Sequence, residues 1–165
     1  MKAIIATTVF GVLMMFSGIA VSNRKSIAAI AVILFGLLFG VSIWDLACTS
    51  ASSPQLLFNN MLRLDHTSLW FTMLMTGCTF LYVLIMAGEI QKVGSYVAEY
   101  FALIFFILCG LYLLAGYNNI LILFIGIEIL SIPQYILAGS DKRNLKSSEA
   151  ALKYFLMGSF STGIL

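Results

Sequence analysis

Long apolar segments, separated by short polar ones, form the main pattern along this 165-residue chain. Charge-free windows cover residues 3–23, 26–44, 67–88 and 100–127, and a transmembrane helix needs about 20 predominantly apolar residues. The last window is too long for one helix, and the turn-forming residues Gly116-Tyr117-Asn118-Asn119 interrupt it. The pattern therefore predicts an all-α, polytopic transmembrane helix bundle. Its six expected spans are residues 3–22, 26–45, 67–88, 97–115, 119–138 and 147–165.

The first and the last predicted spans lie at the two ends of the chain. The last begins near Ser147 and is still running at Leu165, so the single membrane domain is expected to be truncated within its sixth helix. The first also has features of a secretory signal, namely a preceding lysine and small residues at Gly18-Ile19-Ala20. Its full span length and the Arg24-Lys25 pair that follows it favour a permanent helix over a cleaved one.

The longest connection between predicted spans covers residues 45–66. It begins with the turn-forming stretch 48–54 and continues with loosely alternating apolar and polar residues up to Asp65. This alternation predicts a short hairpin or a segment that lies in the membrane interface.

The composition agrees with a membrane protein and excludes several other classes. Hydrophobic residues make up 61% of the chain and charged residues 10%, with a mean hydropathy of +1.04, whereas soluble domains are about half apolar and a quarter charged. A disordered tail, a nucleic-acid-binding module and a disulfide-rich secreted domain are excluded on the same grounds. The three cysteines are about thirty residues apart and the chain has one histidine, so the cysteines are expected to serve packing. No metal site and no cofactor are expected on this chain.

Basic residues are distributed unevenly between the loops, and this distribution predicts an orientation. Lysines and arginines near span ends are retained on the cytoplasmic side of the membrane. The first, third and fifth loops carry six of them, while the N-terminus and the second and fourth loops carry two. The odd loops are therefore expected in the cytoplasm and the N-terminus outside. The six are Arg24, Lys25, Lys92, Lys142, Arg143 and Lys146, and the two are Lys2 and Arg63.

Most acidic residues lie at the ends of predicted spans. They are Asp45, Glu89 and Glu99, together with Asp65 beside His66. Side chains at such places are usually hydrated, so no chemistry is expected from them.

Glu128 is different, because it lies about ten residues from either end of the fifth span. At 1.5 Å per residue this places it near the bilayer midplane, where a charged group costs about 2.5–3.5 kcal/mol and marks an ion path or a proton relay by default. A carboxyl group there either faces a hydrated cavity or binds a proton. Glu128 is therefore the first candidate for proton transfer, and the alternative is a hydrogen bond to a neighbouring helix.

Ser131 and Pro133 follow Glu128 on the same span, and both are candidate supports for it. Pro133 cannot donate to the carbonyl of Ile129, which predicts a kink and a free carbonyl able to hold a water beside Glu128. Ser131 lies three residues from Glu128 and offers a hydroxyl on the same face. The alternative is that both are ordinary packing features of a membrane helix.

Lys153 is the second charge within a predicted span. Lys146, Glu149, Lys153 and Phe160 share one helical stripe, with Glu149 and Lys153 in the favourable acid-then-base order. Lys153 is only about a turn and a half inside the span, so its ammonium group is also able to extend to the cytoplasmic interface. Spacing alone leaves both interpretations open.

Two stretches of the C-terminal half resemble a known family. Residues 118–137, NNILILFIGIEILSIPQYIL, and residues 147–165, SSEAALKYFLMGSFSTGIL, resemble the fifth and sixth helices of subunit N of NADH-quinone oxidoreductase, the respiratory complex I. Residues 99–115, EYFALIFFILCGLYLLA, resemble the fourth helix of that family. The resemblance is strong over residues 99–165, while the earlier helices match in number and hydropathy only.

This resemblance implies a role in proton translocation. It matches Glu128 to the fifth-helix glutamate and Lys153 to the sixth-helix lysine of the family's proton pathway. It also implies that the chain is the N-terminal part of an antiporter-like fold of about fourteen helices in two inverted repeats. NADH, FMN, iron–sulfur clusters and quinone are then expected in partner subunits, and the partners of this chain are other membrane-arm subunits, the lipid bilayer and protons.

The resulting hypothesis is a proton-translocating, antiporter-like subunit of NADH-quinone oxidoreductase in the bacterial inner membrane. Its catalytic candidates are Glu128 and Lys153, and the supporting ones are Glu149, Ser131, Pro133 and Lys146. The GIE-LS-P pattern also occurs in multisubunit cation/proton antiporters and membrane-bound hydrogenases, so a subunit of either is the first alternative. The second is a structural membrane subunit in which the two charges only join helices.

Overall fold

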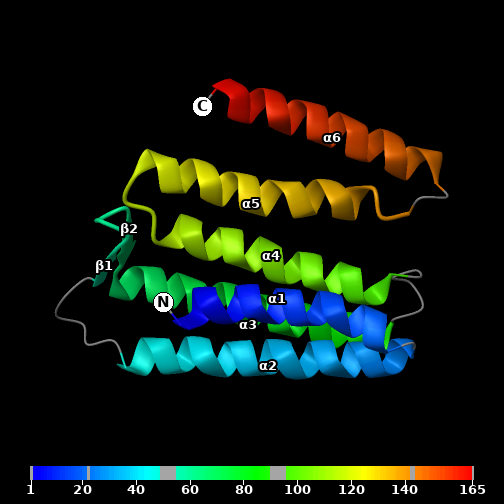
Figure 1. Ribbon diagram of the computed structural model, residues 1–165, viewed down its shortest axis with the longest axis horizontal. Coiled ribbons are helices and arrows are strands. Elements are labelled where there is room, and N and C mark those ends of the chain that lie inside the picture. Colours follow the sequence, from blue (N-terminus) through cyan, green and yellow to red (C-terminus); the bar gives the residue numbers. More distant parts are fainter. Residues whose placement is uncertain (1, 22, 49–54, 90–95, 142–143, 165) are drawn as a thin grey trace.

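The computed structural model describes residues 2–21, 23–48, 55–89, 96–141 and 144–164, and it is a bundle of long helices with one small hairpin (Figure 1). The predicted all-α class is confirmed. The helices are α1 (Lys2–Ala20), α2 (Arg24–Cys48), α3 (His66–Gly88), α4 (Val97–Ala115), α5 (Ile120–Ala138) and α6 (Leu145–Ile164), and the strands are β1 (Gln55–Leu57) and β2 (Leu62–Leu64).

Within the described residues, α1 to α5 are long and apolar enough to cross a membrane. α6 is long enough, but Lys146, Glu149 and Lys153 make its first half more polar than the other helices. A sixth span therefore stays a prediction.

The helices alternate in direction, so their ends form two sides of the bundle (Figure 1). α1, α3 and α5 finish on one side, here called the odd-loop end; α2 and α4 finish on the other, the hairpin end, where the chain also begins. Arg24, Lys25 and Lys146 are exposed at the odd-loop end. The other basic residues predicted there, Lys92, Lys142 and Arg143, lie outside the described residues. Which side faces the cytoplasm stays a prediction.

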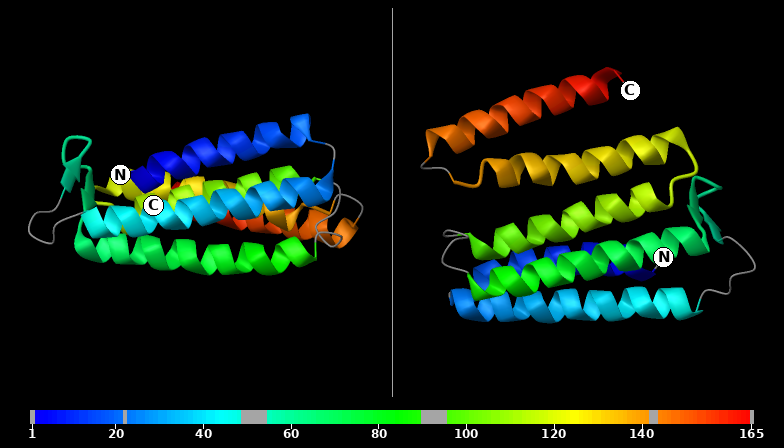
Figure 2. Two further views of the ribbon diagram at one scale, coloured as in Figure 1. Left: turned by 90° about the horizontal axis from the view of Figure 1, so that it is seen from below. Right: turned by 180° about the vertical axis from the view of Figure 1, so that it is seen from behind.

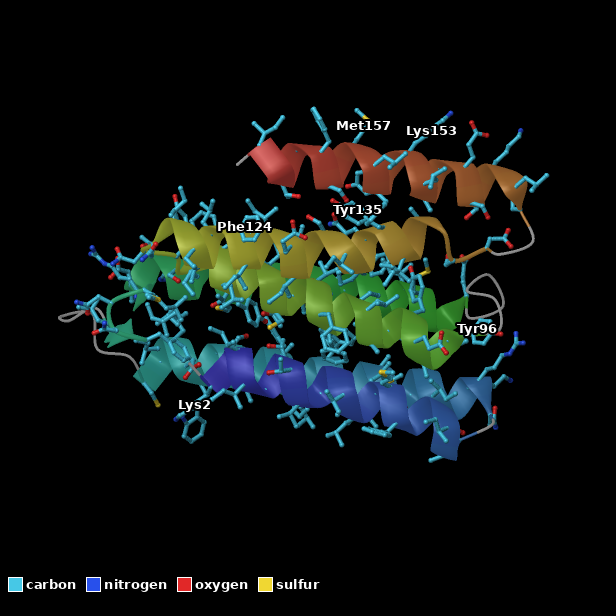
Figure 3. All side chains as sticks on the ribbon, turned by 45° about the horizontal axis from the view of Figure 1, so that its top comes forward. Lys2, Tyr96, Phe124, Tyr135, Lys153 and Met157 are labelled. Atoms are coloured by element: carbon cyan, nitrogen blue, oxygen red, sulfur yellow. The ribbon has the colours of Figure 1, made fainter. Side chains whose placement is uncertain are left out.

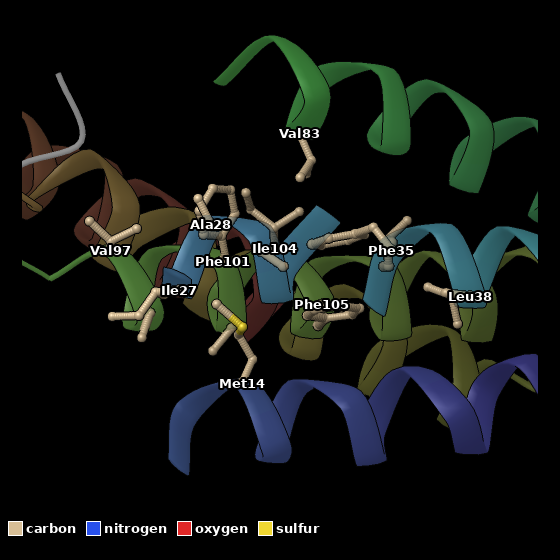
Figure 4. Close-up of a cluster of buried hydrophobic side chains, with 14 of the residues drawn as sticks. Met14, Ile27, Ala28, Phe35, Leu38, Val83, Val97, Phe101, Ile104 and Phe105 are labelled. Atoms are coloured by element: carbon tan, nitrogen blue, oxygen red, sulfur yellow. The ribbon is translucent and has the colours of Figure 1, made fainter. Parts of the chain in front are cut away.

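The core lies among α1, α2, α3 and α4, while α5 packs along α4 and α6 packs along α5 (Figure 1). The rings of Phe35 and Phe105 stack with their centroids 3.8 Å apart, and Phe10 packs edge-on against Phe105 at 6.3 Å. Figure 4 shows Phe35 and Phe105 with other buried apolar side chains between the helices. Lipid is as apolar as these side chains, so close van der Waals packing holds the helices together.

Glycines allow α4 and α5 to approach closely. A Cβ atom built on Gly110 would lie 2.6 Å from the backbone nitrogen of Leu130, and one built on Gly126 would lie 2.9 Å from Leu114 Cδ2. Small residues at helix interfaces are the usual device for close packing in membranes. These contacts fix which face of α5 turns toward α4.

The predicted hairpin or interfacial segment forms an antiparallel hairpin that docks on the turn between α4 and α5. Leu62 and Leu64 of β2 are buried against this turn. The Arg63 N–H donates to Gly116 O at 2.7 Å, and the Asn118 N–H donates to Met61 O at 3.0 Å. These bonds pair backbone groups that would otherwise lack partners, so the hairpin joins the α2–α3 connection to the α4–α5 turn beyond the helix ends (Figure 2).

Asp45 is not hydrated, contrary to the expectation from its position at a span end. Its side chain is 7% exposed, and its carboxylate accepts a hydrogen bond from the Ala3 N–H at 3.0 Å. The first N–H groups of a helix lack partners within the helix and favour a nearby negative charge. Asp45 of α2 therefore caps the N-terminus of α1, which the bundle brings beside it.

Loss of this cap should lower stability. Asp45→Ala is expected to reduce the free energy of unfolding of the full-length protein by about 2 kcal/mol, because it removes a buried hydrogen bond to a charged group. Asp45→Asn keeps an acceptor oxygen, so its loss should be about half as large. Denaturant titration in detergent measures both, and a wild-type stability for Asp45→Ala would show that the cap contributes nothing.

The cysteines follow the packing expectation only in part. Cys109 is buried in α4, whereas Cys48 and Cys78 are exposed on outer faces, and all three are free thiols. Glu89 and Glu99 are exposed at helix ends as expected. Asp65 forms an ion pair with Arg63 at 2.8 Å.

Candidate functional site

The candidate site lies on α5, which begins at a capped turn. The Asn119 side chain accepts a hydrogen bond from the Leu121 N–H at 3.1 Å, which pairs one of the free N–H groups at the start of the helix. From there α5 continues through Pro133 to Ala138. This places Glu128 in the middle of the helix.

α5 has two faces with different surroundings. Gly126, Leu130 and Pro133 recur at helical spacing, and this face packs on α4. Glu128 and Tyr135, seven residues apart, share the opposite face. Tyr135 packs edge-on against Tyr154 and Phe155 of α6, with ring centroids 5.0 and 5.8 Å apart (Figure 3). Glu128 therefore faces the α6 side of the helix.

The Glu128 side chain is partly buried, and among the described residues its carboxylate has no hydrogen bond or ion pair. An unpaired carboxylate in apolar surroundings is costly, so it requires water, a proton or a cationic partner. The interpretation of Glu128 as a residue that only hydrogen-bonds a neighbouring helix has no such bond to support it within the part of the chain that is described.

Ser131 and Pro133 do not support Glu128 in the way the sequence suggested. The Ser131 hydroxyl donates to the Ile127 carbonyl at 2.6 Å, so its proton is used within α5 and only its lone pairs face outward. Pro133 is buried on the α4 face, seven residues after Gly126. Because Pro133 has no N–H, the Ile129 carbonyl is left free on the side of α5 that faces α4. A water held by that carbonyl would therefore not lie beside Glu128.

α6 contacts α5 through a row of small and aromatic residues. Ser147 Oγ donates to Ala138 O at 2.7 Å, and the Tyr154 hydroxyl donates to Gln134 Oε1 at 3.4 Å. A Cβ atom built on Gly158 would lie 2.5 Å from Tyr135 Cζ, so Gly158 leaves the space that the tyrosine ring occupies.

Lys153 lies on the other side of α6. Its ammonium group forms an exposed ion pair with Glu149 Oε1 at 2.5 Å, and Lys146 lies on the same stripe. This stripe is opposite the residues that contact α5, and Lys153 points away from α5 (Figure 3). The structure therefore does not bring Lys153 to Glu128, because the body of α6 lies between them.

Comparison with known proteins identifies the family of this chain. The family model described as "NADH:quinone oxidoreductase/Mrp antiporter, TM" matches residues 117–165, which include α5 and α6. NADH-quinone oxidoreductase subunit N of Cytophaga hutchinsonii is 35% identical over the whole chain, and that of Flavobacterium psychrophilum is 33% identical. The chain spans about a third of the length of these relatives, 35% of each.

The chain belongs to the NADH-quinone oxidoreductase subunit N family. Its fold is also similar to that of a chain in the solved structure of respiratory complex I from Thermus thermophilus with bound Aureothin. The TM-score is 0.70 at 24% identity, and the match covers 98% of this chain and 34% of that one. Together with its long apolar helices, this makes it an integral membrane protein.

The contact between Tyr135 and Gly158 was not predicted from the sequence of this subunit N family member. Tyr135 lies seven residues after Glu128, and this spacing indicates that it shares the face of the carboxylate. Gly158 has no such signal, because a glycine in a membrane helix faces lipid or a neighbour without any difference in local sequence.

A methyl group at Gly158 should loosen the contact between α5 and α6. Gly158→Ala must displace the Tyr135 ring, and overpacking of this kind typically costs about 1–3 kcal/mol. Amide hydrogen exchange of residues 145–164 in the assembled protein is expected to become faster. Gly163→Ala is the matched control on the same helix, because its added Cβ meets no described atom within 4 Å apart from its own helix backbone and chain neighbours. Equal exchange in the two variants would contradict the proposed role of Gly158.

Proposed function

We propose that the chain is part of a proton-translocating, antiporter-like membrane subunit of NADH-quinone oxidoreductase. The observation that carries this proposal is the mid-helix Glu128, which has no partner among the described residues and lies in the segment matched by the family model. The subunit would couple electron transfer from NADH to quinone, performed in other subunits, to proton movement across the membrane.

In this proposal Glu128 binds and releases the translocated proton. A nearby positive charge stabilises the carboxylate, and withdrawal of that charge favours protonation. Lys153 is a separate proton-carrying group, since it lies on the face of α6 that points away from α5 (Figure 3). Glu149 holds the protonated ammonium group at 2.5 Å, and Lys146 adds positive charge at the start of the same stripe. Ser131 offers an acceptor oxygen near Glu128, and Pro133 shapes the helix on its α4 side.

The redox chemistry would lie outside this chain. In this proposal NADH, FMN, the iron–sulfur clusters and quinone belong to partner subunits, and no cofactor or metal ligand is expected from this chain. Its partners are other membrane-arm subunits and the lipid of a bacterial inner membrane. The N-terminus would lie outside and the odd loops in the cytoplasm, because the odd loops carry six of the basic residues and the other side two.

Purification of the full-length protein from native membranes tests the proposal. The assembly that contains it is expected to oxidise NADH with a quinone and to acidify proteoliposomes during turnover. An assembly that exchanges cations for protons without oxidising NADH would favour a cation/proton antiporter, and one that evolves or consumes hydrogen would favour a membrane-bound hydrogenase. Either result would overturn the assignment.

A purely structural role is the remaining alternative, and variants at the two charges distinguish it. A structural subunit would lose assembly in the Glu128 and Lys153 variants without a separable defect in proton movement. A proton-translocating subunit would assemble and fail to pump.

A further inference from the structure

The buried polar side chains of the four-helix core lie apart from Glu128. They occupy the half of the core next to the hairpin, while the buried side chains that the structure describes in the odd-loop half are apolar. Three of them, Ser68, Thr72 and Thr76, lie four residues apart on α3 and therefore share one face. We call these three the hydroxyl row. The whole set is Thr7, Ser42, Asp45, Ser68, Thr72 and Thr76.

The direction of the hydrogen bonds in the hydroxyl row follows from the proton count. Thr72 Oγ1 donates to Leu69 O at 2.8 Å, and Thr76 Oγ1 donates to Thr72 O at 2.5 Å. The Tyr112 hydroxyl of α4 lies 2.5 Å from Thr76 Oγ1, and a hydroxyl has one proton to donate. Tyr112 is therefore the donor to Thr76, and Thr72 Oγ1 keeps its lone pairs for a further donor.

Ser68 is the exception in the hydroxyl row. Its side chain is 5% exposed, and its Oγ is buried without a hydrogen-bond partner among the described residues. Buried hydroxyl groups in proteins are paired with protein atoms or with ordered water. Ser68 and Thr72 lie one helical turn apart on the same face, with Cβ atoms about 5–6 Å apart. At this spacing one water can lie within hydrogen-bond distance of both hydroxyl groups.

Polar groups also lie near Ser68 at the hairpin end, at the start of α3. Asp65 occupies the N-cap position of α3 but makes no side-chain cap, because its carboxylate pairs with Arg63. The first N–H groups of α3 lie one turn or less from Ser68, and this side chain does not cap them.

We propose that Ser68 and Thr72 hold an ordered water molecule inside the membrane-spanning bundle, reached from the hairpin end. The water accepts a hydrogen bond from the Ser68 hydroxyl and donates one to Thr72 Oγ1, which satisfies both groups. The hydroxyl row ends at Thr76, which pairs with Tyr112. It does not continue to Glu128, because α5 packs on the Gly110 side of α4 while Tyr112 faces α3.

A density map of the full-length protein in its native complex tests the site directly. A peak is expected within hydrogen-bond distance of both Ser68 Oγ and Thr72 Oγ1. An empty position, in a map that resolves other buried waters, would overturn the proposal. This measurement needs no variant.

The direction in which Ser68→Ala changes amide exchange gives an independent test. With bound water, Ser68→Ala loses the bridge, and amide exchange of residues 68–76 should become faster by about tenfold. Without water, the same change removes an unpaired hydroxyl, so exchange should be unchanged or slower, and the proposal fails. Ser42→Ala is the matched control, since Ser42 is similarly buried but donates to Phe39 O at 2.8 Å without a water.

Discussion

Glu128→Gln is expected to slow proton movement through this subunit by about 10²-fold, the contribution usual for a group that transfers a proton. Glutamine has nearly the shape of glutamate and can still form hydrogen bonds, through one acceptor oxygen and one donor NH2 group, but it cannot take up and release a proton. The helix should fold normally, because Glu128 makes no hydrogen bond or ion pair with the described residues that the change would break. Acidification of proteoliposomes per NADH oxidised by the purified complex measures the effect.

Two further variants make this result specific. Glu128→Asp keeps a titratable group on a side chain one methylene shorter, so part of the pumping should return. Glu99→Gln removes an exposed carboxylate at the start of α4 and should pump like the wild type. Assembly of each complex is checked by native electrophoresis. Unchanged pumping by an assembled Glu128→Gln complex would remove Glu128 from the proton path.

The second large effect is expected at Gly110, where α4 and α5 meet. A Cβ atom there would lie 2.6 Å from the Leu130 backbone nitrogen and 2.9 Å from its Cα, distances that the main chain cannot relieve by a rotamer change. Gly110→Ala must therefore move the two helices apart. The expected loss is about 3 kcal/mol in the free energy of unfolding, at the upper end of usual overpacking costs.

Gly40→Ala is the same chemical change as Gly110→Ala, but it is not expected to destabilise the protein. Gly40 lies within α2, and its added Cβ meets no described atom within 4 Å apart from its own helix backbone and chain neighbours. Alanine favours a helix by about 1 kcal/mol over glycine, so this variant should be as stable as the wild type or more stable. The thermal midpoint of the full-length protein measures both changes. A Gly110→Ala variant as stable as Gly40→Ala would show that α4 and α5 are not held by this contact.

The contact at Gly110 also bears on Glu128. It fixes the rotation of α5 about its own axis, and that rotation turns Glu128 toward α6 instead of α4. A variant that separates α4 from α5 is therefore expected to reduce pumping as well as stability. Glu128→Gln should reduce pumping alone, so the two defects are distinguishable.

The helices and their breaks could be predicted because their causes are local. Charge-free windows of span length and the turn at 116–119 identify α4 and α5 without any knowledge of their neighbours. The alternating stretch before Asp65 likewise indicates the hairpin. Glu128 stands out for the same reason, since a carboxylate in the middle of an apolar helix is unusual wherever that helix packs.

Positions that depend on another helix could not be predicted in this way. Asp45 resembles a hydrated charge at a span end until α1 brings its free N–H groups beside it. Ser131 resembles a partner of Glu128, but its proton is used by its own helix. The sequence offers Glu128 and Lys153 as two candidates for one proton path, but it does not say whether they meet. The packing of α6 directs Lys153 away from α5, the helix that carries Glu128.

The sequence by itself determined that this chain is a membrane protein, where its helices lie to within about three residues at each end, and which charges are out of place. Those properties follow from hydropathy and turn chemistry, which act over a few residues. Only the tertiary structure decided which face of each helix meets a neighbour, because that choice depends on which side chains interlock across the interface. The rotation of α5 on α4 and of α6 on α5 therefore decided what surrounds Glu128 and what separates it from Lys153.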